Sequence, residues 1–189
     1  MKEALAKFIR KKVTAGDEEI AHILSYFKPY TAKKNEILLR EGGLATKMYF
    51  VIKGCLRIYF IKEAGTEVTR RIIFENDTSA SMISFITENP SKEYIQAVMH
   101  TELLYMDRKD FYYLVETDRI WEKFYRHQLE YAYVANTSRL MSFITNDATE
   151  RYLSLLKENP ELVKRLPNRL VANYLNITQE GLSRLKSKL

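Results

Sequence analysis

Between Lys34 and Met106 the sequence is a series of short runs rich in Ile, Val, Tyr and Phe, and no other feature constrains the fold more. Turn-forming pairs such as Gly42-Gly43, Lys53-Gly54 and Ala64-Gly65 separate the runs. Many short strands joined by such turns are typical of a small antiparallel barrel or jelly roll. We predict strands within residues 36–39, 48–52, 55–61, 68–74, 94–99 and 102–106.

Helical periodicity flanks this strand region on both sides. Residues 2–27 predict one or two helices that end at Pro29, because proline interrupts helical hydrogen bonding. After the strands, residues 107–116 predict a short helix, and Asp118 is a suitable N-cap for a long helix that runs to about Asn146. The expected fold is therefore α+β: an N-terminal antiparallel β-roll with flanking helices, a long connecting helix, and a helical C-terminal domain. We predict domain bounds of 1–117, 118–146 and 147–189.

The long helix has apolar residues on more than one side. One stripe repeats at alternating spacings of four and three, which is the pattern of a loose, polar coiled-coil seam. A second stripe, Leu129, Tyr133, Leu140 and Phe143, faces another way, so we expect the helix to pack on its own β-roll as well as on a twin helix. The alternative is a single buried helix in a monomer. The predicted dimer seam contains Ile120, Phe124, His127, Tyr131, Val134, Ser138 and Met141.

The last segment, Asn168–Lys188, reads as helix, tight turn, helix. Asn176 stands where the turn needs a residue that tolerates a left-handed backbone, and Thr178 is a good N-cap for the second helix. Leu182, Leu185 and Leu189 mark the buried face of that helix. The opposite face carries polar and basic side chains that suit base edges and phosphates. The alternative is an ordinary helical hairpin with a solvated polar face.

Composition narrows the function classes. The chain of 189 residues has a net charge of +6, and residues 161–189 carry six Lys or Arg against two Glu, a net charge of +4. The single cysteine, Cys55, excludes an intrachain disulfide framework and an iron–sulfur cluster held by one chain, and we expect it to be a core residue. His22, His100 and His127 are isolated, so we predict no haem, metal or other cofactor. We find no signal peptide and no apolar run long enough to span a membrane, and we therefore expect a cytoplasmic protein.

Two segments resemble the cyclic-nucleotide-binding β-roll of the cyclic-AMP receptor protein/fumarate-nitrate regulator (Crp/Fnr) superfamily. They are residues 35–43, Asn-Glu-Ile-Leu-Leu-Arg-Glu-Gly-Gly, and residues 48–59, with the hairpin Val51-Ile-x-Gly54-x-x-Arg57. The resemblance continues to Leu189 and implies a homodimeric bacterial transcription factor. It implies base reading by Gln179, Glu180 and Arg184. Relatives usually follow this helix with a β-hairpin wing, which we expect to be lacking here. The predicted DNA-binding residues are Arg169, Thr178, Gln179, Glu180, Ser183, Arg184, Lys186 and Lys188, with Arg169, Lys186 and Lys188 placed for phosphates.

The segment that holds the nucleotide in the family departs from the pattern. Ala80-Ser81 stands near the position of the family's Gly-Glu, and Ser91-Lys92-Glu93 near its Arg-Ser-Ala. Because a buried phosphate without a bidentate arginine is costly, we predict no response to cyclic AMP or cyclic GMP. Lys92 is a point charge and a poor substitute for arginine. The segment either lines a pocket for another ligand or is a packed, empty remnant. The candidate pocket residues are Ser79, Ser81, Ser84, Lys92, Tyr94, Asn136 and Thr137.

These observations predict a homodimeric, sequence-specific DNA-binding regulator that recognises a pseudo-palindromic duplex site and responds to an unknown small-molecule effector. Activation of transcription would require contact with RNA polymerase, for which the sequence has no readable signature. A first alternative is a ligand- or protein-binding module of the same fold that has lost DNA binding. A second is an enzyme on a cupin-like β-roll, but such a metal site needs several histidines and only His100 lies among the predicted strands. We therefore predict that the protein is not an enzyme.

Overall fold

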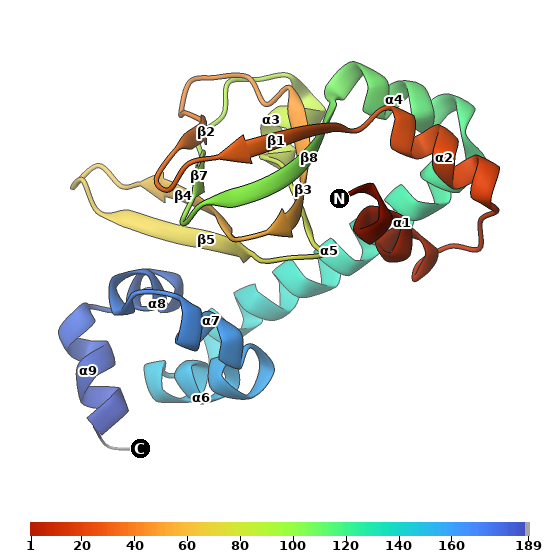
Figure 1. Cartoon of the computed structure of the whole chain (residues 1–189). Helices are drawn as coiled ribbons and strands as arrows, with labels where there is room; N and C mark the ends of the chain where they lie inside the picture. Colours follow the sequence, from red (N-terminus) through yellow and green to blue (C-terminus); the bar gives the residue numbers. More distant parts are fainter. Residues whose placement is uncertain (188–189) are drawn as a thin grey trace.

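The computed structural model describes residues 1–187. Two helices, α1 (Lys2–Arg10) and α2 (Asp17–Ser25), precede an antiparallel β-roll (Figure 1). Within residues 1–187 the strands form two four-stranded sheets, with the orders β1-β8-β3-β6 and β2-β7-β4-β5. This arrangement confirms the predicted β-roll. The strands are β1 (Lys28–Ala32), β2 (Ile37–Leu39), β3 (Lys47–Lys53), β4 (Leu56–Ile61), β5 (Glu67–Ile73), β6 (Thr78–Ser79), β7 (Tyr94–Ala97) and β8 (Thr101–Asp107).

Strand β1 is one element that the sequence patterns did not predict. It contains Pro29, which has no N–H to give to a neighbouring strand. The sheet tolerates this residue because β1 lies at an edge and pairs only with β8, where Pro29 faces Leu104. Proline therefore ends the preceding helix as expected, but the chain then continues directly into the sheet.

The long helix α5 (Arg119–Thr145) leaves the β-roll and leads to the C-terminal domain (Figure 1). Asp118 caps its start, because its carboxylate accepts hydrogen bonds from the N–H groups of Ile120 and Trp121, both at 2.9 Å. Both the cap and the helix agree with the sequence prediction. The first turns of α5 are buried on one side. There Trp121 and Phe124 join a core with α1, α2, β3, the short helix α3 (Met82–Thr87) and α4 (Arg108–Thr117).

The C-terminal domain contains α6 (Ala148–Glu158), α7 (Pro160–Arg165), α8 (Asn168–Leu175) and α9 (Gln179–Ser187). Asp147 caps α6 through the N–H groups of Thr149 and Glu150. Helix α7 was not predicted as a separate element. Pro160 occupies its first turn, where the missing N–H of proline costs nothing. Among residues 1–187, no helix combines the length and the apolar composition needed to cross a membrane.

The C-terminal domain follows α5 in the chain, and it also packs against the β-roll. Its apolar core, built around Val171 and Leu182, extends to Cys55 and Val98 of the β-roll, with Phe74 packed against it. Cys55 is fully buried, as expected, and burial raises the pKa of its thiol to about 12. Helices α8 and α9 are therefore held in a defined position relative to the β-roll.

Candidate nucleic-acid interface and sensor pocket

The turn between α8 and α9 has the geometry that its residues predict. Asn176 adopts the left-handed conformation, with φ 55° and ψ 46°. The N–H groups of Asn176 and Ile177 donate to the carbonyls of Asn173 and Ala172 at 3.2 and 3.0 Å, which closes the end of α8. Thr178 then caps α9, because its Oγ1 accepts a hydrogen bond from the Gly181 N–H at 3.0 Å. Local chemistry therefore confirms the helix-turn-helix.

Helix α9 buries Leu182 and exposes polar side chains on its opposite face. Gln179 and Glu180 are each followed by an exposed residue four positions later, and this spacing keeps the pairs on one side of a helix. Within residues 1–187, Arg184 makes no ion pair, so its guanidinium remains available to a partner. The exposed set is Thr178, Gln179, Glu180, Ser183 and Arg184, five of the eight predicted DNA-binding residues.

Two of the residues that we expect to contact DNA phosphates, Arg169 and Lys186, have partners within the chain. Arg169 is exposed, and its Nη1 lies 3.5 Å from Oε2 of Glu67 on β5. That carboxylate also pairs with the buried Arg57 at 2.7 Å. Lys186 donates from Nζ to Oδ1 of Asn168 at 2.6 Å, across the two helices of the motif. Lys188 lies outside the described residues.

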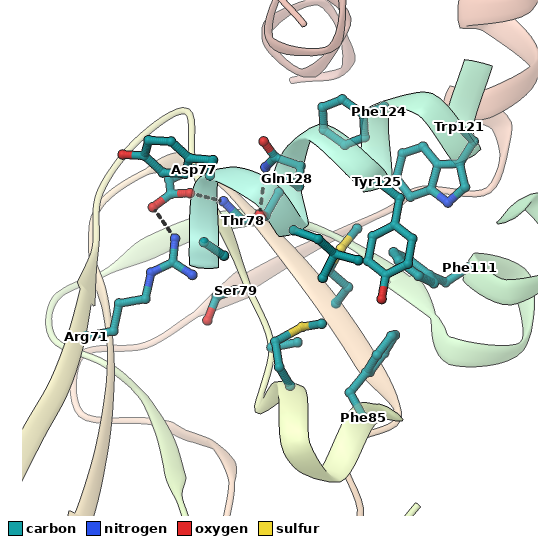
Figure 2. Close-up of a pocket in the computed structure, with 16 residues that line it drawn as sticks. Arg71, Asp77, Thr78, Ser79, Phe85, Phe111, Trp121, Phe124, Tyr125 and Gln128 are labelled. Carbon is teal, nitrogen blue, oxygen red and sulfur yellow. Dashed lines mark hydrogen bonds and ion pairs between the residues drawn. The ribbon is translucent and has the colours of Figure 1, made fainter. Parts of the chain in front are cut away.

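A cavity lies between the β-roll and α5, where the resemblance would place an effector (Figure 2). Its volume is about 80 Å³, well below the roughly 300–1,000 Å³ of small-molecule sites. Aromatic side chains of α3, α4 and α5 line it, among them Phe85, Phe111 and Tyr125 (Figure 2). In this conformation the cavity is too small for a nucleotide.

One edge of this cavity is polar. Arg71 donates from Nη2 to Oδ2 of Asp77 at 2.7 Å, and the other oxygen of Asp77 accepts from the Thr78 N–H at 2.7 Å (Figure 2). Gln128 of α5 donates from Nε2 to the Thr78 hydroxyl at 3.2 Å. These contacts tie α5 to the β-roll beside the cavity. Gln128 was not among the predicted pocket residues, because only the packing of α5 places it next to Thr78.

The residues that stand near the nucleotide-holding positions of the resembling family are hydrogen-bonded to one another here. The buried hydroxyls of Ser81 and Ser91 are 3.0 Å apart, and Ser81 donates to Oε2 of Glu93 at 2.9 Å. Arg70 then makes two hydrogen bonds to the same Glu93 carboxylate. The Ser81 and Ser91 hydroxyls and the Glu93 carboxylate are therefore already hydrogen-bonded within the chain, and Arg70 is neutralised by Glu93.

The other predicted pocket residues do not converge on one cavity. Ser79 lines the 80 Å³ cavity, and its buried hydroxyl has no partner among the described residues. Ser84 is buried and accepts from the Ala45 N–H at 3.0 Å. Tyr94 stacks on Tyr59, with ring centroids 5.0 Å apart. Lys92 and Thr137 are exposed, and Asn136 lines a different, larger cleft.

The outer face of α5 carries large apolar side chains that are exposed in the single chain. From the predicted seam, Phe124 is only 1% exposed and Ile120 packs against the same core, so Phe124 has no surface left for a second copy. Val134 and Met141 come from the first stripe, Tyr133 and Leu140 from the second, and Ile144 from neither. We call them the α5 arc: Tyr133 (73% exposed), Val134 (61%), Leu140 (59%), Met141 (50%) and Ile144 (68%).

The β-roll is similar to a known domain family. Residues 30–118 match the cyclic nucleotide-binding domain. The chain is also 27% identical over 99 residues to a global nitrogen regulator from Nostoc sp.. That alignment covers 52% of this chain, and the chain spans only 40% of the length of that relative.

Solved structures match nearly the whole chain. The c-di-GMP-responsive global regulator CLP of Xanthomonas campestris superposes with a TM-score of 0.72 at 18% identity, covering 92% of this chain and 91% of that one. A transcriptional regulator of the Crp/Fnr family from Eubacterium rectale superposes with a TM-score of 0.71 at 16% identity, covering 90% and 82%. These likenesses confirm the fold that the sequence resemblance implied.

Proposed function

We propose that this chain, a Crp/Fnr-type regulator by its fold and its cyclic nucleotide-binding domain, binds specific DNA sequences as a homodimer. The observation that carries the proposal is the solvent-facing side of α9. It combines an arginine without an ion pair in the described chain, a glutamate and a glutamine on one helix face. Arginine binds guanine O6 and N7 bidentately, and glutamate accepts from cytosine N4, so this face suits the major groove.

The α5 arc supports the dimer. Several large apolar side chains close together on a water-exposed helix face are typical of an interaction surface. Residues 133, 137, 140 and 144 recur at spacings of four, three and four, with Val134 and Met141 alongside, which is the spacing of a helix pair. We assign the dimer seam to this arc. Val134 and Met141 were already in the seam predicted from the sequence, whereas the buried Phe124 is not part of it.

Twofold pairing along α5 would present two copies of α9 to one face of a duplex. The matching site is a pseudo-palindrome whose half-sites are separated by about one helical turn, roughly 34 Å. The proposed regulator does not use cyclic AMP or cyclic GMP. The cavity of about 80 Å³ and the Ser81–Ser91–Glu93 contacts both oppose a cyclic nucleotide.

Selection of bound duplexes from a random library, at near-physiological salt, tests this function. The wild-type chain should enrich an inverted repeat, and Arg184→Ala should lose the preference at the base pairs that Arg184 contacts. Lys109→Ala is the matched control, because it removes one exposed positive charge from α4, outside the C-terminal domain. Failure of the wild type to enrich any sequence, with and without cell-extract metabolites, would contradict the proposal. It would favour a module of this fold that binds a ligand or a protein instead.

Calorimetric titration with cyclic AMP and cyclic GMP tests the proposed effector specificity separately. We expect no saturable binding at nucleotide concentrations up to about 1 mM, a dissociation constant that corresponds to about −4 kcal/mol. Binding in the micromolar range would contradict this proposal.

A further inference from the structure

A second, larger cleft lies where the three parts of the molecule meet. Its volume is about 460 Å³, within the range of small-molecule sites. Its walls come from β5 of the sensor domain, the middle of α5, and helices α6 and α8 of the C-terminal domain. In the described chain, four arginines line it: Arg70, Arg71, Arg139 and Arg151. We call it the arginine cleft.

Two of these arginines are neutralised within the chain and two are not. Arg70 pairs with Glu93, and Arg71 pairs with Asp77. Among residues 1–187, neither Arg139 nor Arg151 forms an ion pair. Glu158 also lines the cleft, but it is exposed and forms no ion pair with any of the four arginines in the described structure.

Neutral groups hold Arg139 and Arg151 in place. Arg139 donates from Nη2 to the Tyr174 carbonyl at 2.6 Å, and its guanidinium lies 3.8 Å from the centre of the Tyr174 ring. Arg151 donates from Nη1 to the Asn146 carbonyl at 2.7 Å and lies over the Phe143 ring. Nε of Arg151 is buried and has no hydrogen-bond partner in the described chain. Each guanidinium has five N–H donors, so most of them remain unused.

The positive charges also act on one another. Burial lowers the pKa of Arg139, and the nearby charges of Arg70 and Arg151 lower it further, against the opposite effect of Tyr174. Arginine stays protonated in proteins, so the charge cannot be relieved by losing a proton. Partly buried like charges without counter-ions are unfavourable unless something compensates them.

We propose that the arginine cleft binds a small anion that carries phosphate or carboxylate groups. Arg139 and Arg151 supply the charged donors, and the hydroxyls of Ser138, Ser142 and Ser154, which also line the cleft, supply neutral donors. An anion there contacts the sensor domain, α5 and the C-terminal domain at once. Binding of the anion would shift the position of α9. This regulatory effect rests on the proposed function, whereas the binding itself does not.

Calorimetric titration of the full chain with sodium pyrophosphate, and separately with inorganic phosphate, tests the binding. Sodium chloride is added so that the ionic strength stays constant during each titration, because salt screens the interactions of surface charges. We expect saturable binding by the wild type, and at least about tenfold weaker binding by Arg139→Gln and by Arg151→Gln, since each removes a charged hydrogen-bond donor. Arg119→Gln removes an exposed arginine outside the cleft and should bind like the wild type.

A charge added inside the cleft provides a second test that does not depend on losing an arginine. Ser142 lines the cleft one helical turn after Arg139, so Ser142→Glu places a carboxylate beside the unpaired guanidiniums. We expect this variant to unfold at a higher temperature than the wild type without anions, and to lose pyrophosphate binding. Ser142→Gln, of the same size but neutral, should keep the binding.

Several outcomes would overturn the proposal. Binding no tighter than that of chloride would do so, as would retention of pyrophosphate by Ser142→Glu. Equal weakening by Arg119→Gln would show adventitious binding to surface charge. No measurement in this experiment uses DNA, so its failure is distinct from failure of the duplex selection.

Discussion

Arg165 and Glu75, ninety residues apart in the sequence, form a two-pronged ion pair between the C-terminal domain and the β-roll. Nη1 and Nη2 of Arg165 each lie 2.7 Å from one oxygen of Glu75. The same carboxylate accepts from the Gly54 N–H at 2.8 Å. Gly54 has φ of +110°, and a Cβ there would lie 2.6 Å from the Thr101 hydroxyl, so only glycine fits this turn. The pair therefore anchors helix α7 to a turn of fixed geometry.

Breaking this pair should loosen the C-terminal domain. Arg165→Gln leaves the partly buried Glu75 without its charged partner, and we expect a loss of about 1–3 kcal/mol in the free energy of unfolding. Urea denaturation at fixed protein concentration measures it. Lys164→Gln is the control, because Lys164 is exposed and its ion pair in the described chain is with Glu161 on its own helix, at 3.5 Å. Equal losses in the two variants would contradict the anchoring role.

The same pair predicts a pH dependence. The hydrogen bonds from Arg165, more than that from Gly54, lower the pKa of Glu75 from its ordinary 4.5 to about 2. A lowered pKa in the folded state adds stability above the unfolded pKa, and this stability is lost as the pH falls from about 4.5 to about 2. The wild type should therefore be more stable than Glu75→Gln at pH 7. The difference in unfolding free energy should shrink below pH 4.5, and a constant difference down to pH 2 would contradict the assignment.

The α5 arc predicts the effect of a charge on self-association. Ile144→Glu places a carboxylate in the proposed seam of each copy. The two carboxylates would repel each other, so the variant should convert dimers into monomers. Sedimentation velocity at micromolar concentration measures the change. Ile83→Glu on α3 is a matched control, since Ile83 is equally exposed in the single chain but lies outside α5. If both variants remain dimers, the arc is not the interface.

Arg169 should contribute affinity without contributing sequence specificity. Its position at the start of α8 suits a phosphate contact, and Arg57 would keep Glu67 paired after its removal. Arg169→Gln should therefore lower the slope of log affinity against log salt by about one, and the selected duplex sequence should not change. Fluorescence anisotropy with the selected duplex at several salt concentrations measures this. A changed consensus sequence would mean that Arg169 reads bases.

Much of the fold follows from signals carried by residues a few positions apart. The caps Asp118 and Thr178, the left-handed Asn176 and the runs of strand-forming residues each stabilise their own segment. Elements without such a signal were not predicted: β1 depends on pairing with β8, and the first turn of α7 depends on Pro160 starting a helix rather than ending one.

The sensor region was less predictable, because side-chain partners there are far apart in the sequence. The composition of residues 78–94 indicated that the family's phosphate-binding residues are absent. It did not indicate that Arg70 of β5 would pair with Glu93, or that Gln128 of α5 would contact Thr78. The arginine cleft has no local sequence signal, since its arginines come from β5, α5 and α6.

The sequence by itself determined the helix-turn-helix, the β-roll and the long helix, because hydrophobic periodicity and capping act over one or two turns of chain. Only the tertiary structure decided which face of α5 is free. Phe124 and Tyr133 are both aromatic residues of the same helix, yet the core formed with α1 and α4 buries the first and leaves the second exposed. Whether a residue is buried depends on which side chains pack against it, and these side chains come from segments that are far apart in the sequence.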